Sequence, residues 1–409
     1  MLTSKCFFTN MIKPEFTVYD SAYKKPIVLT FVGNYLPGYK AGGILRSLAN
    51  AVDNLRNDIH FWIVTRDRDL KDDKPYDTIR INQWQPVGHA MVYYMPTDSC
   101  TIKRVADIIQ TTRHDKLYLN SFFDPFTVLA LLARKLRRIS SKYIIVSPRG
   151  EFAWPSLRQK YLKKIFFIQL AKLFRLYNNV TWHASSAQEE EEIIRVMKIR
   201  PESIHVALDL PDIRALDMAI DMTPRSTADS VDLRIIFLSR ISREKNLDYA
   251  LRILMKVNFK VIFDIYGPID NATYWKECQK ILKQLPENVK VNYRGGINHN
   301  KAIQLFSAYD LFFFPTGGEN YGHVIAESLT AGTPVLISDK TPWKNLQSDG
   351  LGWDISLANE NSFVTVIEHM AETMIDARLE NRILIKSALK KRFLDTTAME
   401  ANRQLFRQN

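Results

Sequence analysis

The sequence predicts an α/β protein made of two doubly wound units that face each other across a cleft. Short apolar runs rich in β-branched residues alternate with helical patterns from residue 26 onward, and the same alternation restarts at residue 233. Strands that alternate with helices favour a parallel sheet covered on both faces. The length of 409 residues suits two domains of ordinary size, each of roughly 100–200 residues.

The first unit begins with the apolar run PIVLTFV, which ends at the turn-forming pair Gly33-Asn34. The loop LPGYKAGG follows it, and a helical pattern then covers residues 44–55. The strands that we expect in this unit cover residues 26–32, 61–65, 116–119, 143–146 and 180–183.

A change in composition separates the two units. Residues 209–232 contain two prolines and the polar cluster STADSVD, which is typical of an interdomain linker. We therefore expect a first domain over residues 1–215, of which 1–25 form an extension, and a second over 216–390. Residues 391–409 are expected to form a helix that packs back on the first domain. The second domain is expected to contain strands at 233–238, 261–266, 289–293, 311–314 and 334–338, and a helix at 246–257.

The composition bounds the class of protein. With 46% hydrophobic and 24% charged residues, the chain resembles ordinary soluble proteins and has enough apolar material for two cores. The net charge of +12 favours anionic partners, although a basic solvated surface explains it equally well. Cys6, Cys100 and Cys278 show neither zinc-ligand spacing nor a disulfide framework. We find no signal-peptide pattern and no apolar run long enough to span a membrane, and we expect a cytoplasmic protein.

The segment Pro315–Trp343, which reads PTGGENYGHVIAESLTAGTPVLISDKTPW, carries the strongest functional signal. The Gly-Gly pair at 317–318 allows a tight turn, and the start of the following helix suits a phosphate. Glu319 and Glu327 form a Glu-x7-Glu pair, and a carboxylate can accept two hydrogen bonds from vicinal sugar hydroxyls. Both could instead be ordinary helix residues, but the glycines before them and the Ala-Gly-Thr-Pro-Val after them favour a binding site.

Basic residues crowd the connection after the strand expected at 233–238. Arg240, Arg243 and Lys245 could neutralise a diphosphate, with a basic surface turn as the alternative. Positive charges beside a helix N-terminus are unfavourable by themselves, so an anionic partner is expected. The pair Gly42-Gly43 also precedes a helix, but its loop matches neither G-x-G-x-x-G nor a Walker A sequence, and a plain turn is the alternative.

Together these segments resemble the family 4 (group 1) retaining glycosyltransferases of bacterial surface-polysaccharide type, which have the GT-B architecture of two Rossmann-like domains. The matching segments, in chain order, are YKAGG, YLNSFFDP, IIVSPRGEFAWPSL, WHASSAQEEEEI, FLSRISREKNLD, ENYGHVIAES and GTPV. The Glu-x7-Glu block and the pair Arg240/Lys245 are the specific parts of the resemblance, which extends over residues 26–395.

The resemblance implies a role for each matching residue. Arg240 and Lys245 would bind the donor diphosphate and stabilise the departing nucleotide. Glu319 would lie near the anomeric carbon of the donor sugar, and Glu327 would hold the ribose hydroxyls. Further donor contacts would come from the backbone of Gly42, Gly43, Gly295, Gly296, Asn320, Tyr321 and Gly322.

One stretch of the first domain departs from the family pattern. Many family members carry a histidine near the donor sugar, whereas the corresponding stretch here reads SPRGEF. Arg149 or Glu151 would take that place in donor binding, and we expect His183, at the end of another strand, to be structural.

We expect no cofactor and no metal. Two basic side chains and a helix N-terminus could stabilise the departing diphosphate, and the nucleotide sugar is itself the co-substrate. No Asp-x-Asp pair flanked by strand signals is present. The acidic-basic loop that holds Asp67, Asp69, Asp72 and Asp73 is expected to be solvated.

The region 134–175 carries twelve Lys and Arg residues and one acidic residue, Glu151. Its stretch RQKYLKKIFFIQLAKLFRLY mixes apolar residues with lysines at helical spacing. Such a helix suits an anionic membrane surface, and a domain helix with a core-facing apolar stripe and solvated lysines is an equal alternative. Nucleic acid is not expected as a partner because no binding motif accompanies the charge.

We therefore predict a retaining transferase that moves a hexose or related sugar from a UDP- or GDP-sugar to a glycan acceptor. A lipid-linked oligosaccharide of O-antigen, capsule or exopolysaccharide synthesis is the expected acceptor. The alternatives are a sugar-nucleotide epimerase or phosphorylase of the same architecture, and a non-catalytic sugar-nucleotide-binding protein. A phosphorylase would show a pyridoxal lysine site, which we do not identify. A non-catalytic protein would be expected to lack Glu319, Arg240 or Lys245, and all three are present.

Overall fold

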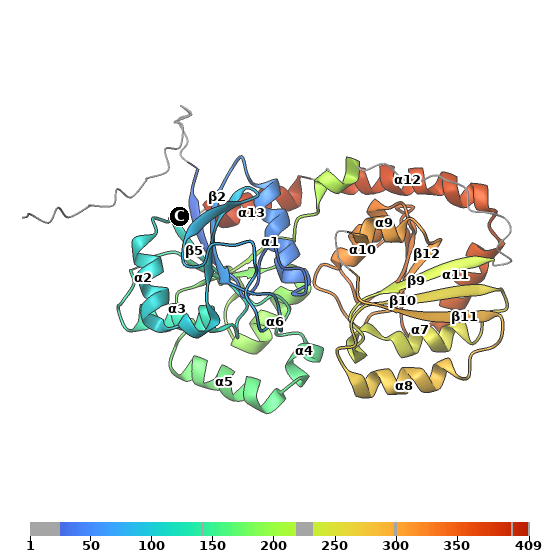
Figure 1. The fold of residues 1–409 in the computed structure, drawn as a ribbon, viewed down its shortest axis with the longest axis horizontal. Coiled ribbons are helices and arrows are strands. Elements are labelled where there is room, and N and C mark those ends of the chain that lie inside the picture. The colour runs from blue at the N-terminus through green and yellow to red at the C-terminus, as the bar shows by residue number, and fades with distance from the viewer. Residues whose placement is uncertain (1–24, 141, 218–231, 298–300, 394–395, 408–409) are drawn as a thin grey trace, which may run out of the picture.

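Two α/β units lie side by side in the computed structural model (Figure 1). The structure describes residues 25–140, 142–217, 232–297, 301–393 and 396–407. Almost all of the expected N-terminal extension and much of the expected linker lie outside these residues. Within them, each unit contains its own sheet, and the prediction of two doubly wound domains is confirmed.

The first domain contains an eight-stranded sheet in the order β3-β4-β2-β1-β5-β6-β7-β8. Its strands are β1 (Ile27–Phe31), β2 (His60–Arg66), β3 (Trp84–Val87), β4 (Ala90–Met95), β5 (Lys116–Asn120), β6 (Ile144–Ser147), β7 (Thr181–Ala184) and β8 (Ile204–Val206). Neighbouring strands are parallel except β3 and β4, so the expectation of a purely parallel sheet is wrong at this edge. Pro86, which lacks a backbone donor, is tolerated in β3 because β3 is the edge strand.

Six helices accompany the first sheet, together with short 3-10 turns. The helices are α1 (Gly43–Asn54), α2 (Ile102–Thr111), α3 (Pro125–Lys135), α4 (Trp154–Arg158), α5 (Tyr161–Leu173) and α6 (Ala187–Met197). The turns are η1 (Thr97–Ser99), η2 (Pro201–Ser203) and η3 (Ile213–Asp217). Local sequence determines where some helices begin. The side chain of Asp124 caps α3, and that of Ser186 caps α6.

The second domain contains a six-stranded, fully parallel sheet in the order β11-β10-β9-β12-β13-β14. Its strands are β9 (Leu233–Leu238), β10 (Val261–Tyr266), β11 (Val289–Gly295), β12 (Leu311–Phe314), β13 (Val335–Ser338) and β14 (Gly352–Ile355). All four side chains of β12, LFFF, are fully buried, as expected for a central strand covered on both faces.

Helices cover this sheet on both sides, with α9 and α10 on one side and α7 and α8 on the other (Figure 1). The helical segments of the domain are η4 (Arg243–Lys245), α7 (Leu247–Leu254), α8 (Ala272–Leu282), α9 (Ala302–Phe306), α10 (His323–Thr330) and α11 (Glu360–Glu372). They enclose one continuous core around β9, β10, β12 and β13.

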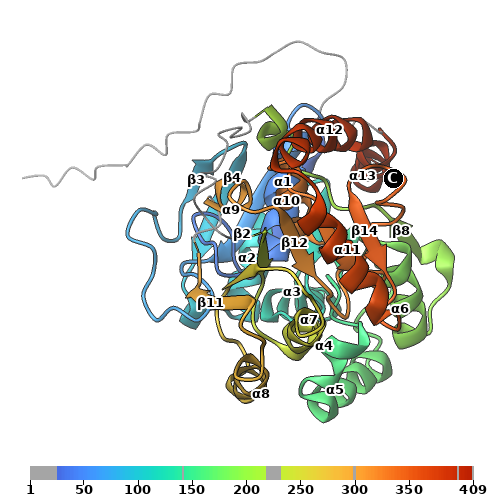
Figure 2. The ribbon, with the colours of Figure 1, turned by 90° about the vertical axis from the view of Figure 1, so that its right-hand side faces the viewer.

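The chain returns to the first domain at its end. Helix α12 (Ile375–Phe393) runs along the second domain, and α13 (Thr397–Arg407) lies on the first domain (Figures 1 and 2). The ring of Phe406 in α13 makes edge contacts with Phe61 at 5.5 Å and Tyr118 at 5.2 Å between ring centres. Asn402 also donates to the backbone carbonyl of Leu208 at 2.8 Å. The last helix therefore completes the core of the first domain.

Candidate active site

The order of the second sheet reverses at β9, which lies between β10 and β12. Loops that follow β9 and β12 diverge at such a point and leave room for a ligand at the carboxyl ends of the strands. The loop after β9 carries Lys245, and the loop after β12 carries Glu319. The backbone N–H of Gly317 donates to the carbonyl of Glu244 at 2.6 Å, which holds the two loops together.

Lys245 and Glu319 meet between these loops. The Lys245 Nζ lies 2.7 Å from the Glu319 Oε1, and the side chains are 12% and 17% exposed. A buried ammonium needs a neutralising partner, which Glu319 supplies here. A bound diphosphate would offer Lys245 a second anionic partner at the same place. The structure thus brings together two of the residues that the sequence placed at the reaction centre.

Arg240 has different partners from Lys245. Its guanidinium forms ion pairs with Glu244 at 3.2 Å and with Asp270 at 3.1 Å, and the side chain is 52% exposed. Exposed ion pairs of this kind are weak, so Arg240 can exchange them for phosphate oxygens at little cost. The structure places Arg240 at the rim of the loop that carries Lys245.

The segment from Asn320 to Gly322 leads into the N-terminus of α10. Gly322 has φ of 79°, which favours glycine, and no side chain caps this helix end. The first N–H groups of a helix lack intrahelical acceptors, and an uncapped end therefore suits an anionic ligand. The Trp343 Nε1 donates to the Tyr321 carbonyl at 2.6 Å and fixes the approach to the helix.

Glu327 lies one turn further along α10 and lines a small pocket between the two domains. Arg46 and Asn50 of α1 line the same pocket from the first domain. Burial lowers the pKa of the Arg46 guanidinium, and the charge of Glu327 opposes that shift. Glu327 therefore faces a cationic side chain of the other domain. No motif around Arg46 would single it out in the sequence.

A buried carboxylate shapes the glycine loop of the first domain. The prediction that the loop with Asp67 and Asp69 is solvated is wrong for both residues, which are 2% and 4% exposed. The Asp69 Oδ2 accepts the backbone N–H of Tyr39 at 2.8 Å and that of Lys40 at 3.1 Å. Sequence reasoning missed this role because a charged residue normally signals exposure, whereas here backbone donors of a distant loop satisfy it.

The glycines that the resemblance assigns to donor contacts have open space beside their backbone. Gly42 has φ of 70° and Gly295 has φ of 75°, and no atom of the described residues lies within 4 Å of the position of an added Cβ at either residue. At Gly43 the nearest atom is the His323 Cδ2 of α10, at 3.8 Å. Gly42 and Gly43 therefore lie at the side of the first domain that faces α10.

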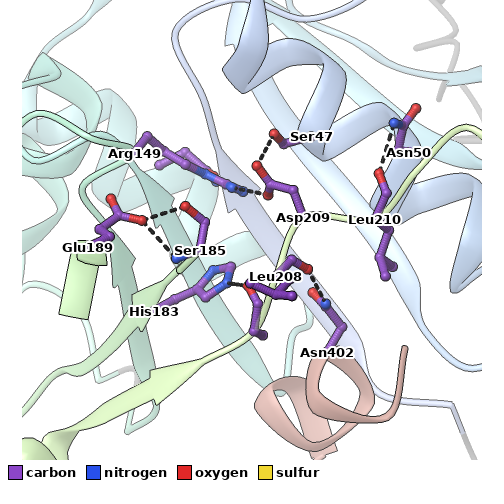
Figure 3. A network of polar contacts seen from close by, with 12 residues as sticks. Ser47, Asn50, Arg149, His183, Ser185, Glu189, Leu208, Asp209, Leu210 and Asn402 are labelled. Carbon is purple, nitrogen blue, oxygen red and sulfur yellow. Dashed lines mark hydrogen bonds and ion pairs between the residues drawn. The ribbon is translucent and has the colours of Figure 1, made fainter. Parts of the chain in front are cut away.

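Arg149 lies in a buried network of the first domain (Figure 3). Its guanidinium donates to the Asp209 Oδ1 at 2.6 Å, to the Asn120 Oδ1 at 3.1 Å and to the Tyr118 hydroxyl at 2.8 Å. The side chain is 5% exposed. Arg149 thus uses its donors within the first domain, which makes it a residue that organises the cleft wall.

His183 continues this network (Figure 3). Its Nε2 lies 2.9 Å from the carbonyl of Ala207, and its Nδ1 lies 2.7 Å from the Tyr118 hydroxyl. A carbonyl can only accept, so Nε2 carries the proton and Nδ1 accepts from Tyr118. Burial, followed by the charge of Arg149, lowers the pKa of His183 to about 3, and the imidazole is therefore neutral.

Asp209 connects the network to the second domain. The Ser47 hydroxyl donates to the Asp209 Oδ2 at 2.6 Å and lies 2.9 Å from the His323 Nε2. Because the serine has one proton and gives it to Asp209, the His323 Nε2 is the donor in the second contact. A chain of polar contacts thus runs from Arg149 through Asp209 and Ser47 to the first residue of α10. The sequence did not single out Asp209, Ser47 or His323.

Neighbours of Arg149 also have local partners. Glu151 accepts from the Ser121 hydroxyl at 2.7 Å and from the backbone of Phe122 at 2.5 Å, and burial raises its pKa to about 7. At Gly150, with φ of 75°, an added Cβ would lie 2.5 Å from the Asn320 Nδ2 of the second domain. Gly150 is therefore a point of close contact between the domains beside the candidate site.

The sequence of the second domain matches a known family. Residues 222–378 match the family described as "Glycosyl transferases group 1". This match covers less than half of the chain. Over 108 residues the chain is also 30% identical to the "Uncharacterized glycosyltransferase MJ1607" of Methanocaldococcus jannaschii. That match covers 25% of this chain and 26% of the relative, so the chain spans about a quarter of the length of this relative.

The likeness to solved structures covers both domains of the chain. Anabaena Alr3699/HepE, in complex with UDP and glucose, has a TM-score of 0.61 at 16% identity and covers 93% of this chain and 98% of its own. WaaG, a glycosyltransferase involved in lipopolysaccharide biosynthesis, has a TM-score of 0.62 at 13% identity, and the match covers 93% of this chain and 100% of WaaG. Sucrose-phosphate synthase from Thermosynechococcus elongatus has a TM-score of 0.65 at 15% identity, and the match covers 94% of this chain and 99% of the synthase. At these identities the likeness establishes the fold, and the predicted GT-B architecture is confirmed.

The described residues contain no group of three or more His, Cys, Asp or Glu side chains that could hold a metal ion. None of the helices in this part of the chain is long and apolar enough to cross a membrane. Transfer without a metal stays a prediction.

Proposed function

We propose that the protein is a retaining glycosyltransferase of family 4 that transfers a sugar from a nucleoside diphosphate donor to a glycan acceptor. The observation that carries this proposal is the contact of Lys245 with Glu319 beside the uncapped N-terminus of α10, within a group 1 domain. Lys245 and the start of α10 offer positive charge to a departing diphosphate, and Glu319 offers a carboxylate beside it.

The donor would lie across the loops that follow β9 and β12. Lys245, Arg240 and the first N–H groups of α10 would bind the diphosphate, and Glu327 would accept hydroxyl groups of the ribose. Solved relatives contain UDP with glucose and UDP-glucose, which supports a UDP-hexose as the donor. The open backbone at Gly295 would suit contact with the base.

The chemistry would rest on stabilisation of the departing diphosphate. The nucleoside diphosphate is already a good leaving group, so the protein mainly needs to bind the negative charge that grows on it and orient the acceptor hydroxyl. Lys245 and Arg240 would supply the positive charge without a metal. Retention of the anomeric configuration would follow from attack on the face from which the nucleotide departs, with Glu319 beside the anomeric carbon.

The first domain would bind the acceptor. WaaG is involved in lipopolysaccharide biosynthesis, and this likeness supports a lipid-linked oligosaccharide of a bacterial surface polysaccharide as the acceptor class. The reaction would take place in the cytoplasm, where nucleotide sugars are available. Arg149 would act on the acceptor side indirectly, by holding Asp209 and the wall of the cleft.

A panel of sugar nucleotides tests the donor. UDP-, GDP- and ADP-sugars are added in turn, and thermal stabilisation and slow donor hydrolysis are measured. A UDP-hexose is expected to raise the melting temperature most, because a ligand that binds only the folded state stabilises it. If no sugar nucleotide shifts the melting temperature, the proposal is wrong. The anomeric configuration of the product, determined by NMR, tests retention.

Lys245→Ala tests the central contact, and Lys256→Ala provides the control. Lys256 is 48% exposed and pairs with Glu360 on another part of the same domain. Loss of a charged hydrogen bond to phosphate should weaken UDP binding by about 10- to 100-fold, whereas the control should leave it unchanged. Equal affinities of the two variants would remove the role assigned to Lys245. Activity that persists after treatment with EDTA would support transfer without a metal.

A further inference from the structure

Helix α5 has apolar residues on two opposite faces. Ile168 and Ala171 face the first domain and are 1% and 4% exposed. Leu162, Phe166 and Leu173 are 82%, 66% and 74% exposed, and their spacing of four and seven residues places them on one side of the helix. The core of the domain therefore accounts for only one of the two apolar stripes.

The exposed stripe belongs to a larger apolar surface. Trp154 of α4 is 58% exposed and lies 6.1 Å from Tyr161, ring centre to ring centre, and Phe174 after α5 is 56% exposed. Single exposed apolar residues are common on proteins, whereas a contiguous patch marks an interaction site. We name as the α4–α5 surface the residues Trp154, Tyr161, Leu162, Phe166, Leu173 and Phe174.

The charges around the α4–α5 surface have one sign. Residues 152–175 contain no aspartate or glutamate. Arg158, Lys160, Lys163 and Arg175 are exposed there. Exposed leucine and aromatic side chains with lysine and arginine around them are the combination that inserts at the boundary between the headgroups and acyl chains of an anionic bilayer.

A second copy of the chain fits this surface less well. A symmetric pair would bring the same basic residues of both copies together, and like charges across an interface are repulsive. An anionic bilayer neutralises these residues and also accepts the apolar stripe. Charge complementarity therefore favours a lipid surface as the occupant.

We propose that the α4–α5 surface docks the protein on an anionic lipid bilayer. The segment between the two helices also reaches the donor loop, since the Gln159 Nε2 donates to the Glu244 Oε2 at 3.3 Å. Glu244 pairs with Arg240 and accepts from Gly317, as described above. Docking would therefore place the bilayer beside the candidate site. This positional consequence, unlike the docking itself, rests on the proposed function with a lipid-linked acceptor.

Co-sedimentation with vesicles tests the docking. The full chain is mixed with vesicles of phosphatidylcholine alone or with phosphatidylglycerol added, and the bound fraction is measured. We expect binding to the anionic vesicles, with weaker binding at high salt. The variant L162Q/F166Q/L173Q should lower the partition coefficient at least about tenfold, since each replaced side chain loses its transfer from water.

Two matched controls isolate the surface. M374Q/I383Q/L384Q removes three comparably exposed apolar side chains near and along α12 and should bind vesicles like the unmodified chain. R158Q/K160Q/K163Q should lose the preference for anionic vesicles, whereas K276Q/K280Q/K283Q, which removes exposed lysines at α8, should retain it. Thermal unfolding of each variant is measured with and without UDP. A cooperative unfolding transition shows that the variant is folded, and a shift with UDP also shows that it still binds the nucleotide.

The outcomes separate this proposal from the proposed function. Vesicle binding that is absent, or unchanged in L162Q/F166Q/L173Q, overturns the docking proposal even if the protein is an active transferase. A change in oligomeric state on size-exclusion chromatography without a change in vesicle binding also overturns it, in favour of self-association. Vesicle binding that the variant loses supports the docking proposal even if no sugar nucleotide binds.

Discussion

The buried imidazole of His183 makes the first domain sensitive to acid. Its pKa is lowered from 6.5 to about 3, so the folded protein keeps the ring neutral while the unfolded chain binds a proton below pH 6.5. The unfolded state therefore gains protons first as the pH falls. The contribution of His183 to the free energy of unfolding is fully present above about pH 6.5 and is lost as the pH falls toward 3.

The size of this effect follows from the two pKa values. The contribution of His183 to the free energy of unfolding should fall by about 1.4 kcal/mol for each pH unit below about 6.5, until the folded protein itself takes up the proton. Glu151, whose pKa is raised to about 7, contributes with the opposite sign as the pH falls from about 7, so the effect of His183 is read from the difference between the protein and its variant. At about pH 5.5 the contribution of His183 is then smaller by about 1 kcal/mol than at about pH 8. Protonation of Nδ1 would also break the hydrogen bond from Tyr118 and place a charge near Arg149, which explains why the folded state resists it.

Urea denaturation at several pH values tests this prediction. His183→Gln should be less stable at pH 8 because it loses packing, but the stability difference between the unmodified protein and this variant should shrink as the pH falls from 8 to 5.5. His89→Gln, at an exposed histidine, controls for removal of a histidine in general. If the stability of His183→Gln falls with acid as steeply as that of the unmodified protein, the neutral buried imidazole is not the cause.

Three further predictions follow from packing and backbone geometry. Phe406→Ala should lower the free energy of unfolding by about 3–5 kcal/mol in urea, because it leaves a cavity in a core that the last helix completes, whereas Phe174→Ala should change it by less than about 0.5 kcal/mol. Gly150→Ala should lower the free energy of unfolding by about 1–2 kcal/mol through backbone strain, and should also reduce kcat because the added Cβ would meet Asn320. Gly88→Ala is the control: Gly88 has φ of 59° and no described atom within 4 Å of an added Cβ, so the substitution should cause strain without reducing kcat. Asp69→Ala should weaken UDP-sugar binding in calorimetry, since the glycine loop loses the carboxylate that holds it; unchanged affinity would separate this loop from the donor site.

Burial explains many of the strands that could be predicted from the sequence. Strands such as β1 and β12 are covered on both faces, so their apolar runs are continuous and were readily found. The strands β3, β4, β8 and β14 were missed. WQPV of β3 and GWDI of β14 contain proline, glycine and polar residues, and β8 has three residues, whereas AMVYYM of β4 is an apolar, buried run like those that were found. Their place in the sheets comes from pairing with neighbours that are already ordered.

The candidate site shows the same limit. Lys245 and Glu319 could be placed together because both follow strands at the point where a doubly wound sheet reverses its order. The contact of Arg149 with Asp209 and that of Ser47 with His323 join residues that are 60 and 276 positions apart, and no local pattern encodes them. Charge alone also misled the prediction for Asp69, because a distant loop supplies its hydrogen-bond donors.

The return of the chain to the first domain has a consequence for synthesis. Leu405 and Phe406 belong to the same core as Val28 and Tyr118, so the first domain cannot close this core until α13 has left the ribosome. Domains commonly fold in the order in which they are made. Here the first domain is the last to be finished, and a chain that stops before residue 397 would lose α13 and expose that core. Only a chain that has been translated through α13 can therefore form a fully closed first domain.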